Sequence, residues 1–206
     1  MAFPTTNANE ELPAINQILA SVGQAPVTTL DQPTPDVAIA YDTLLQVSKE
    51  VQSEGWSFNR EEHYEFTPDT NNEILIPNNV LQLDLTRNGY SHNKDVIRRS
   101  GKLYDKHNHT YKWKDGAVEC DVVWFFDWVD LPTPFQDYIT ARASVLVSSR
   151  IVGDGNQYQM LQQQEAFQRS VILEYECNQG DYSFFGTSQN YPDSYTSYKP
   201  YQALRR

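Results

Sequence analysis

Two amphipathic segments near the start of the chain set its architecture: LPAINQILASVGQAPVTTL (residues 12–30) and DVAIAYDTLLQVSKEVQSEGWSFN (residues 36–59). Apolar residues recur in both at spacings of three and four, which predicts two helices that each bury one face. The first helix is expected from about Pro13 to Val22, because proline suits a first helical turn and Gly23 is a natural stop. Neither segment carries groups arranged for catalysis, so we interpret both as packing elements. The apolar face of the first helix consists of Leu12, Ile15, Leu19 and Val22.

The second helix is preceded by a proline-rich linker and a capping signal. Thr34 can act as N-cap, Pro35 fits the first helical position, and Asp36 puts a negative charge at the positive end of the helix dipole. We expect this helix to run to about Glu54 and to stop at Gly55. Its apolar stripe consists of Val37, Tyr41, Leu44, Val47 or Ser48, and Val51.

The periodicity changes from Trp56 to Val129, where short runs rich in β-branched and aromatic residues are separated by Pro, Asn and Gly. This pattern is typical of strands. In the run VLQLDL (residues 80–85), leucines alternate with polar residues, which predicts a half-buried strand. Hairpin turns are expected at Ser100–Lys102 and near Lys114–Gly116. The sequence therefore predicts a β-rich insertion.

A second pair of helices follows the insertion. Thr133-Pro134 repeats the Thr-Pro start of the earlier helix, and the third helix is expected from Pro134 to about Val152. Glycines at 153 and 155 break the chain before a fourth helix, Asn156–Cys177, which favours an antiparallel hairpin of helices. The predicted apolar faces are Phe135, Tyr138, Ile139, Val145, Leu146 and Ser149, and then Met160, Leu161, Phe167, Val171 and Tyr175.

The predicted fold class is α+β, a bundle of four main helices with a β-rich insertion and an extended C-terminal tail. We divide the chain into a first helical pair (1–55), the insertion (56–130), a second helical pair (131–178) and the tail (179–206). The tail lacks a periodic apolar face and would be extended on its own. Solvated tails avoid aromatic residues, so we expect this one to order on a neighbouring surface. Its aromatic residues are Tyr182, Phe184, Phe185, Tyr191, Tyr195, Tyr198 and Tyr201.

Composition excludes several classes of protein. A net charge of −11 argues against a nucleic-acid binder, which needs Lys and Arg to displace counterions from phosphates, although it would suit a surface that DNA passes without sticking. The 13 tyrosines fit either interfaces or ordinary β-structure. Cys120 and Cys177 are expected to be free thiols in a reducing compartment, unless the fold brings them together. The N-terminus has no signal-peptide pattern, and no apolar run is long enough to span a bilayer.

Two acidic clusters could in principle carry chemistry. Glu61, Glu62 and Glu65 surround His63, and paired carboxylates can act as acid and base, but a strand points neighbouring residues to opposite faces and favours solvated charge. Asp121, Asp127 and Asp130 lie around the run from Trp124 to Trp128 and could form a sugar-binding platform. Alternation would put Trp124, Phe126 and Trp128 on one face, and burial of that face under helices is the simpler interpretation.

Histidines and basic residues give two further candidates. His107 and His109 are close enough in sequence to share a metal, but their stretch is typical of a loop and no partner has matching spacing. No catalytic or cofactor fingerprint is present, so we expect no cofactor and no metal. One basic stretch fits either nucleic acid or an acidic neighbouring subunit. It contains Arg98, Arg99, Lys102, Lys106, Lys112 and Lys114, interleaved with Tyr104, Tyr111 and Trp113.

Most of the chain resembles the tail tubular protein A family, the head-to-tail adaptors or gatekeepers of short-tailed bacteriophages (podoviruses). The first two matching pieces in the following set are the most specific. The resemblance is carried by AINQILASVGQAPVTTL (14–30), VQSEGWSFN (51–59), EEHYEFTPD (61–69), NNVLQLDLTR (78–87), KLYDKHNHT (102–110), LPTPFQDYITARAS (131–144) and QQQEAFQRSVILEYE (162–176).

The resemblance implies a structural virion protein that is not an enzyme. Family members form a dodecameric ring between the portal protein and the tail nozzle, a tail tubular protein B-like partner. The ring lines the DNA channel for genome retention and ejection, without sequence-specific DNA binding or a membrane partner. It would be assembled in the host cytoplasm and reside in the virion tail. The interface residues expected here are the tail aromatics together with Arg98, Arg99 and Lys102. The alternative is a carbohydrate-binding or glycan-hydrolysing tail component that uses Asp127, Asp130 and the nearby Trp residues.

Overall fold

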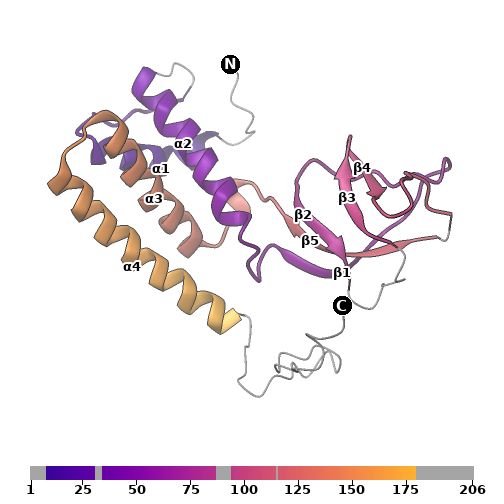
Figure 1. The fold of residues 1–206 in the computed structure, drawn as a ribbon. Helices are drawn as coiled ribbons and strands as arrows, with labels where there is room; N and C mark the ends of the chain where they lie inside the picture. The colour runs from indigo at the N-terminus through magenta and orange to yellow at the C-terminus, as the bar shows by residue number, and fades with distance from the viewer. Residues whose placement is uncertain (1–7, 31–33, 87–93, 115, 180–206) are drawn as a thin grey trace.

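Helices gather at one end of the molecule and strands at the other (Figure 1). The computed structural model describes residues 8–30, 34–86, 94–114 and 116–179. Within this part of the chain, four α-helices and five strands confirm the predicted α+β class. The helices are α1 (Ala8–Ser21), α2 (Pro35–Gln52), α3 (Thr133–Ile151) and α4 (Gly155–Gln179). The strands are β1 (Arg60–Phe66), β2 (Val80–Leu85), β3 (Val96–Arg99), β4 (Lys102–Asp105) and β5 (Val118–Trp124), and a short 3-10 helix, η2, spans Trp128–Asp130.

Helix α1 starts earlier than the sequence suggested. It begins at Ala8, and Pro13 lies inside it with its ring exposed, so the expected start at Pro13 is wrong. Glu10 and Glu11 occupy the first turn, where the positive end of the helix dipole favours negative charge. The predicted stop is confirmed, because Gly23 has a φ of +77° and closes the last turn with a hydrogen bond from its N–H to the Ala20 carbonyl at 3.1 Å.

Helix α2 agrees closely with its sequence signals. The Thr34 hydroxyl accepts a hydrogen bond from the Val37 N–H at 3.5 Å, as expected of an N-cap. The helix ends at Gln52, two residues before the expected end, and Gly55 has a φ of +77°. A Cβ at position 55 would come within 3.2 Å of a Val123 methyl group, so glycine fits both the turn and the space. All residues of the predicted stripe are buried: Val37, Tyr41, Leu44, Val47, Ser48 and Val51.

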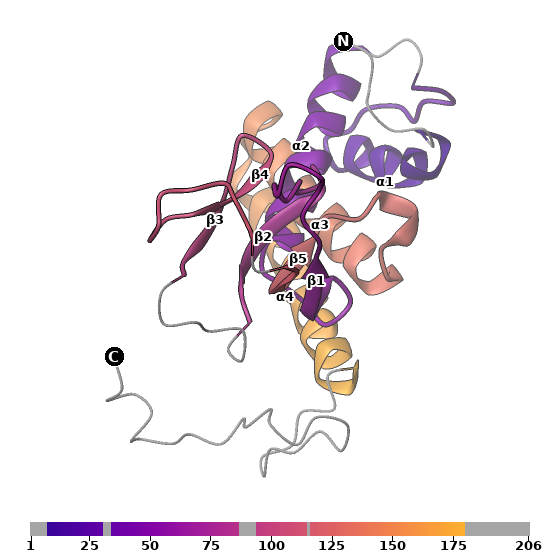
Figure 2. The same ribbon diagram turned by 90° about the vertical axis from the view of Figure 1, so that its right-hand side faces the viewer.

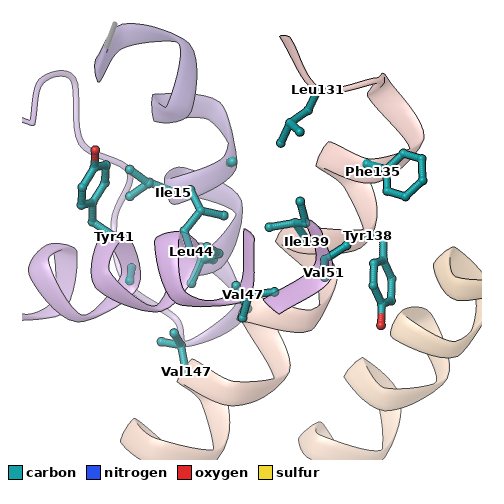
Figure 3. Packing of buried hydrophobic residues seen from close by; sticks show 14 of the residues in the cluster. Ile15, Tyr41, Leu44, Val47, Val51, Leu131, Phe135, Tyr138, Ile139 and Val147 are labelled. Carbon is teal, nitrogen blue, oxygen red and sulfur yellow. The ribbon is translucent and has the colours of Figure 1, made fainter. Parts of the chain in front are cut away.

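Helix α3 lies between the α1–α2 pair and α4, which runs back along it as an antiparallel partner (Figures 1 and 2). Two details of the prediction are wrong. The N-cap position is held by Pro132 rather than Thr133, and Ser149 is exposed while Val147 and Ser148 are buried. Figure 3 shows side chains from α1, α2 and α3 converging on one core, with Tyr138 turned toward α4. The residues labelled there are Ile15, Tyr41, Leu44, Val47, Val51, Leu131, Phe135, Tyr138, Ile139 and Val147.

The strands form two small antiparallel sheets. One has the order β1–β5–β2, and the other is the β3–β4 hairpin. Ser100 and Gly101 connect the hairpin with φ values of 53° and 72°, which confirms the predicted turn and matches a two-residue loop with both residues left-handed. The second predicted turn includes residue 115, which lies outside the described residues. A second core of buried residues fills this region, with Leu103, Trp113, Cys120 and Val122 among its members.

A buried polar junction joins the helices to the sheet. The Asn59 side-chain carbonyl accepts a hydrogen bond from the Trp56 N–H at 2.8 Å, and its amide donates to the carbonyls of Gln52 and Trp124, each at 2.8 Å. Gln52 in turn accepts from the Phe126 N–H at 2.7 Å and donates to the Phe126 carbonyl at 3.1 Å. Because buried amides are costly when unpaired, this reciprocal set fixes the angle between the two parts.

Candidate interaction surfaces

The outward side of α4 is the largest feature that sequence analysis missed. Met160 and Phe167 were expected to be core residues, but their exposed fractions are 72% and 65%. The prediction failed because α4 packs chiefly on α3, with the Gln157 side chain also bonded to the Ser21 carbonyl of α1, so its buried strip is narrow and Ile172 is its one buried residue. Leu161, Val171 and Tyr175 are half-buried. A signal was available in the sequence, since the apolar residues of this helix are few and are interrupted by glutamines.

The charged residues of α4 turn away from this outward side. Glu165 pairs with Arg142 at 3.8 Å, and Arg169 pairs with Glu54 at 2.6 Å. Glu176 accepts hydrogen bonds from Ser57. These contacts anchor α4 to the bundle, and they leave Glu174 as the single charged member of the α4 outer face. We define that face by the exposed residues of the helix: Gly155, Asn156, Tyr158, Gln159, Met160, Gln162, Gln163, Gln164, Ala166, Phe167, Ser170, Leu173, Glu174, Cys177, Asn178 and Gln179.

Three lysines of the basic stretch are paired with carboxylates within the β region. Lys102 lies 2.5 Å and Lys112 3.2 Å from the Glu73 carboxylate, so Glu73 sits between two ammonium groups. The hydrogen bond from Lys102, followed by that from Lys112, lowers the pKa of Glu73. Lys106 pairs with Asp95 at 2.7 Å. These pairs reduce the positive field that a nucleic-acid surface would need.

Arg98 and Arg99 face different surroundings. Arg98 donates to the Asn78 side chain at 2.7 Å and to the Val80 carbonyl at 3.3 Å, which ties the β3–β4 hairpin to β2. Arg99 is exposed, and its guanidinium lies 5.0 Å from the centre of the Tyr104 ring. The expectation that these residues and Lys102 contact a partner stays a prediction.

The outer side of the β3–β4 hairpin also carries exposed apolar residues. Ile97 lies opposite Tyr104 in the ladder, and Leu75 bridges to Lys102, so these side chains share one side of the sheet. Leu75 is 63% and Ile97 47% exposed. The centroids of the Tyr104 and Tyr111 rings lie 4.7 Å apart. Tyrosine, arginine and exposed aliphatic residues together are typical of an interface.

The acidic cluster on β1 has structural contacts. Its register with β5 shifts between Glu61 and Tyr64, and His63 lies in this bulge with a φ of +60°. The bulge interrupts the simple alternation assumed from the sequence. Glu61 accepts a hydrogen bond from the Trp124 indole at 2.9 Å, and the His63 ring lies 3.4 Å from Glu119. Glu61 and His63 of the cluster thus connect β1 to β5.

The proposed sugar platform is not formed as expected. Strand β5 ends at Trp124, which is buried in the β core, and Trp128 begins η2 and packs against the helical core. The expected alternation of Trp124, Phe126 and Trp128 on one strand face is therefore wrong, because the chain leaves the strand to join the bundle. Asp127 and Asp130 are exposed, but the Trp124 side chain is buried and the Trp128 side chain is half-buried.

The described histidines and cysteines have separate surroundings and do not gather into one site. His107 lies in a turn whose backbone is held by the Asp105 carboxylate, and His109 contacts the Tyr104 hydroxyl at 3.5 Å. No cluster of three or more metal-ligating side chains is found in the described part of the chain. Both cysteines are free, as expected: Cys120 is buried and Cys177 exposed. Burial, followed by the nearby Asp121 and Asp84, raises the pKa of Cys120 to about 12.

The sequence of the chain matches a known family over most of its length. Residues 12–182 match the family described as "Tail tubular protein". The chain belongs to the tail tubular protein family. It is similar to "Tail tubular protein A" of Klebsiella phage KP34, with 29% identity over 173 residues that cover 82% of this chain and 88% of the relative. The chain is therefore a structural component of a phage tail.

For a tail tubular protein, the surfaces open to partners matter more than any pocket. Among the described residues, the α4 outer face and the outer side of the β3–β4 hairpin expose large apolar side chains at opposite ends of the molecule (Figure 1). The predicted tail contacts (Tyr182, Phe184, Phe185, Tyr191, Tyr195, Tyr198 and Tyr201) lie outside the described residues. Among the helices of the described ranges, none has the length and apolarity needed to cross a membrane.

Proposed function

We propose that this protein is the head-to-tail adaptor of a short-tailed phage and forms a dodecameric ring between portal and tail nozzle. The observation that carries the proposal is the family match over residues 12–182, together with the similarity to tail tubular protein A of phage KP34. Its two-part architecture supports the same function, since a ring subunit needs one surface for its neighbours and others for the components above and below.

The exposed apolar residues support assembly. Monomeric proteins seldom expose many large apolar side chains together, and such patches mark interaction sites. In our proposal the helical bundle makes the contacts around the ring, and the β region, with Leu75 and Ile97, docks on the nozzle. The aromatic segment after residue 179 reaches the portal or a neighbouring subunit and becomes ordered on binding.

The charge of the chain supports passage of DNA through the ring. Twelve copies with a net charge of −11 each surround the channel with a negative potential that repels phosphates and prevents sticking. The lysines and arginines that could bind DNA are partly neutralised, as in the pairing of Lys102 and Lys112 with Glu73. The ring would thus retain and release the genome mechanically rather than by sequence recognition.

The contacts of the candidate groups support a role without catalysis. The carboxylates of β1, the turn that holds His107 and the buried Cys120 serve packing and hydrogen bonding within the described residues. We infer that the protein is not an enzyme and acts in the virion after assembly in the host cytoplasm.

Electron microscopy of the co-expressed portal, adaptor and nozzle tests the proposal. We expect a twelve-fold ring of this chain on the tail side of the portal, with the nozzle bound only when the ring is present. A nozzle that joins the portal directly, or a ring of another symmetry, would contradict it. Deletion of Asp181–Arg206 should leave a folded protein that no longer joins the portal, and normal incorporation of the truncated chain would exclude the assigned role of the tail.

A further inference from the structure

The α4 outer face differs from the solvent face of an ordinary helix. Of its sixteen residues only Glu174 is charged. On α2, by contrast, the exposed residues are Pro35, Ile39, Asp42, Gln46, Lys49 and Glu50, so three of six are charged. Exposed helix faces are normally rich in charge, and the core of a protein interface is depleted of it. The α4 outer face therefore has the composition of a contact surface, with Met160 and Phe167 as its large apolar side chains.

A second uncharged surface lies at the end of α1 and on the loop that follows it. Residues 13–30 contain no Asp, Glu, Lys, Arg or His, although they include the exposed end of α1 and the loop after it. We define the 13–29 surface by its exposed residues: Pro13, Gln17, Ala20, Gly23, Gln24, Ala25, Pro26, Thr28 and Thr29. Helix α3 lies between α4 and the α1–α2 pair along most of the bundle (Figures 1 and 2), and the two surfaces approach each other where the Gln157 side chain, at the start of α4, donates a hydrogen bond to the Ser21 carbonyl.

Electrostatics restricts where two copies of this chain can meet. Each copy carries a net charge of −11, and like charges brought together at a contact are mutually repulsive. Burying a charge without a partner adds a penalty of several kcal/mol. Amide side chains such as those of Gln159 and Gln163 avoid both costs and can exchange hydrogen bonds with amides and hydroxyls such as those of Gln17 and Thr28. The two uncharged surfaces are therefore suited to each other.

We propose that the α4 outer face of one copy binds the 13–29 surface of the next copy. This inference rests on the proposed ring, and it names the surfaces that close it. Because the two surfaces differ, the contact is head-to-tail, and every copy uses both surfaces in the same way. Such a heterologous contact builds a closed ring when the rotation between copies fits, whereas an α4-to-α4 contact would stop at a dimer.

Paired charge substitutions test this contact. The first variant carries Gln159→Lys and Gln163→Lys on α4, the second carries Gln17→Glu and Gln24→Glu, and a third carries all four. Ring formation on the portal is measured by sedimentation and electron microscopy as a function of protein concentration. The first and second variants should each raise the protein concentration needed for ring formation by about tenfold or more, since each buries unpaired charge. The third should recover, because each ring contact then joins Lys to Glu.

Controls separate a lost contact from a lost fold. Gln46→Lys places one lysine on the exposed side of α2, outside both surfaces, and should leave assembly unchanged. Circular dichroism should show that all variants keep their helices. A mixture of the first variant with a Gln159→Glu, Gln163→Glu chain should not recover, because recovery there would indicate an α4-to-α4 contact.

The remaining outcomes are equally decisive. Normal rings from the first or second variant would overturn the inference while leaving the adaptor role intact, and loss without recovery in the third would overturn the pairing of these two surfaces. Failure of the unmodified chain to form a ring would instead contradict the proposed function.

Discussion

The helical bundle and the β region are stabilised in different ways. In the bundle, aliphatic and aromatic side chains from helices distant in sequence fill one core, and the exposed faces of α1 and α4 carry little charge. In the β region, the short strands are held by a smaller core and by charged groups that pair with one another, such as Glu73 with Lys102 and Lys112. Some charges of the β region are thus already paired within it, whereas the uncharged faces of the bundle can be buried in assembly without leaving a charge unpaired.

The largest effect is expected in the bundle core. Phe135 is fully buried, and its ring lies 5.0 Å from that of Trp56 and 4.6 Å from that of Phe58. Phe135→Ala should lower the free energy of unfolding by ~3–5 kcal/mol, because it leaves a cavity in a packed core. Urea unfolding followed by circular dichroism measures it. Phe167→Ala on the α4 outer face is the matched control and should change the value by less than about 0.5 kcal/mol. Equal losses would mean that α4 is not open on its outer side.

A smaller but substantial effect is expected where the two regions meet. Asn59→Ala removes one acceptor and two donors from buried backbone groups, including the carbonyls of Gln52 and Trp124. The free energy of unfolding should fall by ~2–4 kcal/mol, since unpaired buried groups cost about 1–3 kcal/mol each. Asn79→Ala is the control, because Asn79 is exposed and its backbone carbonyl, which accepts from the Phe125 N–H, is retained. If only the bundle or only the β region unfolded at lower urea concentration, the result would show that Asn59 does not stabilise both regions.

The β region should respond to acid through Glu73. The pKa of Glu73 is lowered in the folded protein, from its usual value of 4.5, by the hydrogen bonds from Lys102 and then Lys112. The stability it contributes is therefore present above pH 4.5 and is lost as the pH falls through the folded pKa. Glu73→Gln should flatten the fall in unfolding midpoint between neutral and acidic pH. Glu174→Gln, which removes an exposed carboxylate from α4, controls for the loss of one negative charge, and an unchanged slope in Glu73→Gln would contradict the prediction.

Local signals predicted the fold well where backbone chemistry dominates. The Thr34 cap, the Gly23 and Gly55 stops and the turn at Ser100 and Gly101 follow from rules that involve few residues. Prediction failed where tertiary packing decides. Whether Phe167 is buried depends on how many helices contact α4, and whether Trp128 extends a strand depends on where the chain turns into the bundle.

The interaction surfaces were less predictable than the fold. The basic stretch was visible in the sequence, but its neutralisation depends on Glu73, which is 29 residues away from Lys102. The sequence predicts a helix and a loop for residues 13–30, but their lack of charge gains meaning only beside the nearly uncharged outer face of α4. A surface is a property of segments brought together, so its composition cannot be read from one segment.

The two cysteines report the accessibility of the two regions to a thiol reagent, without any substitution in the chain. Cys177 is exposed on α4, and Cys120 is buried in the β region with a pKa raised to about 12. Because the thiolate is the reactive form, iodoacetamide at pH 8 should modify one thiol in the native monomer, Cys177, and both in urea. Mass spectrometry of the digested protein identifies the site. In the ring on the portal, Cys177 should become protected while Cys120 stays unmodified, since the α4 outer face is then covered by a neighbour. Equal labelling of Cys177 before and after assembly would exclude this end of α4 from the contact, and labelling of Cys120 in the native chain would mean that the β region opens far more readily than the bundle.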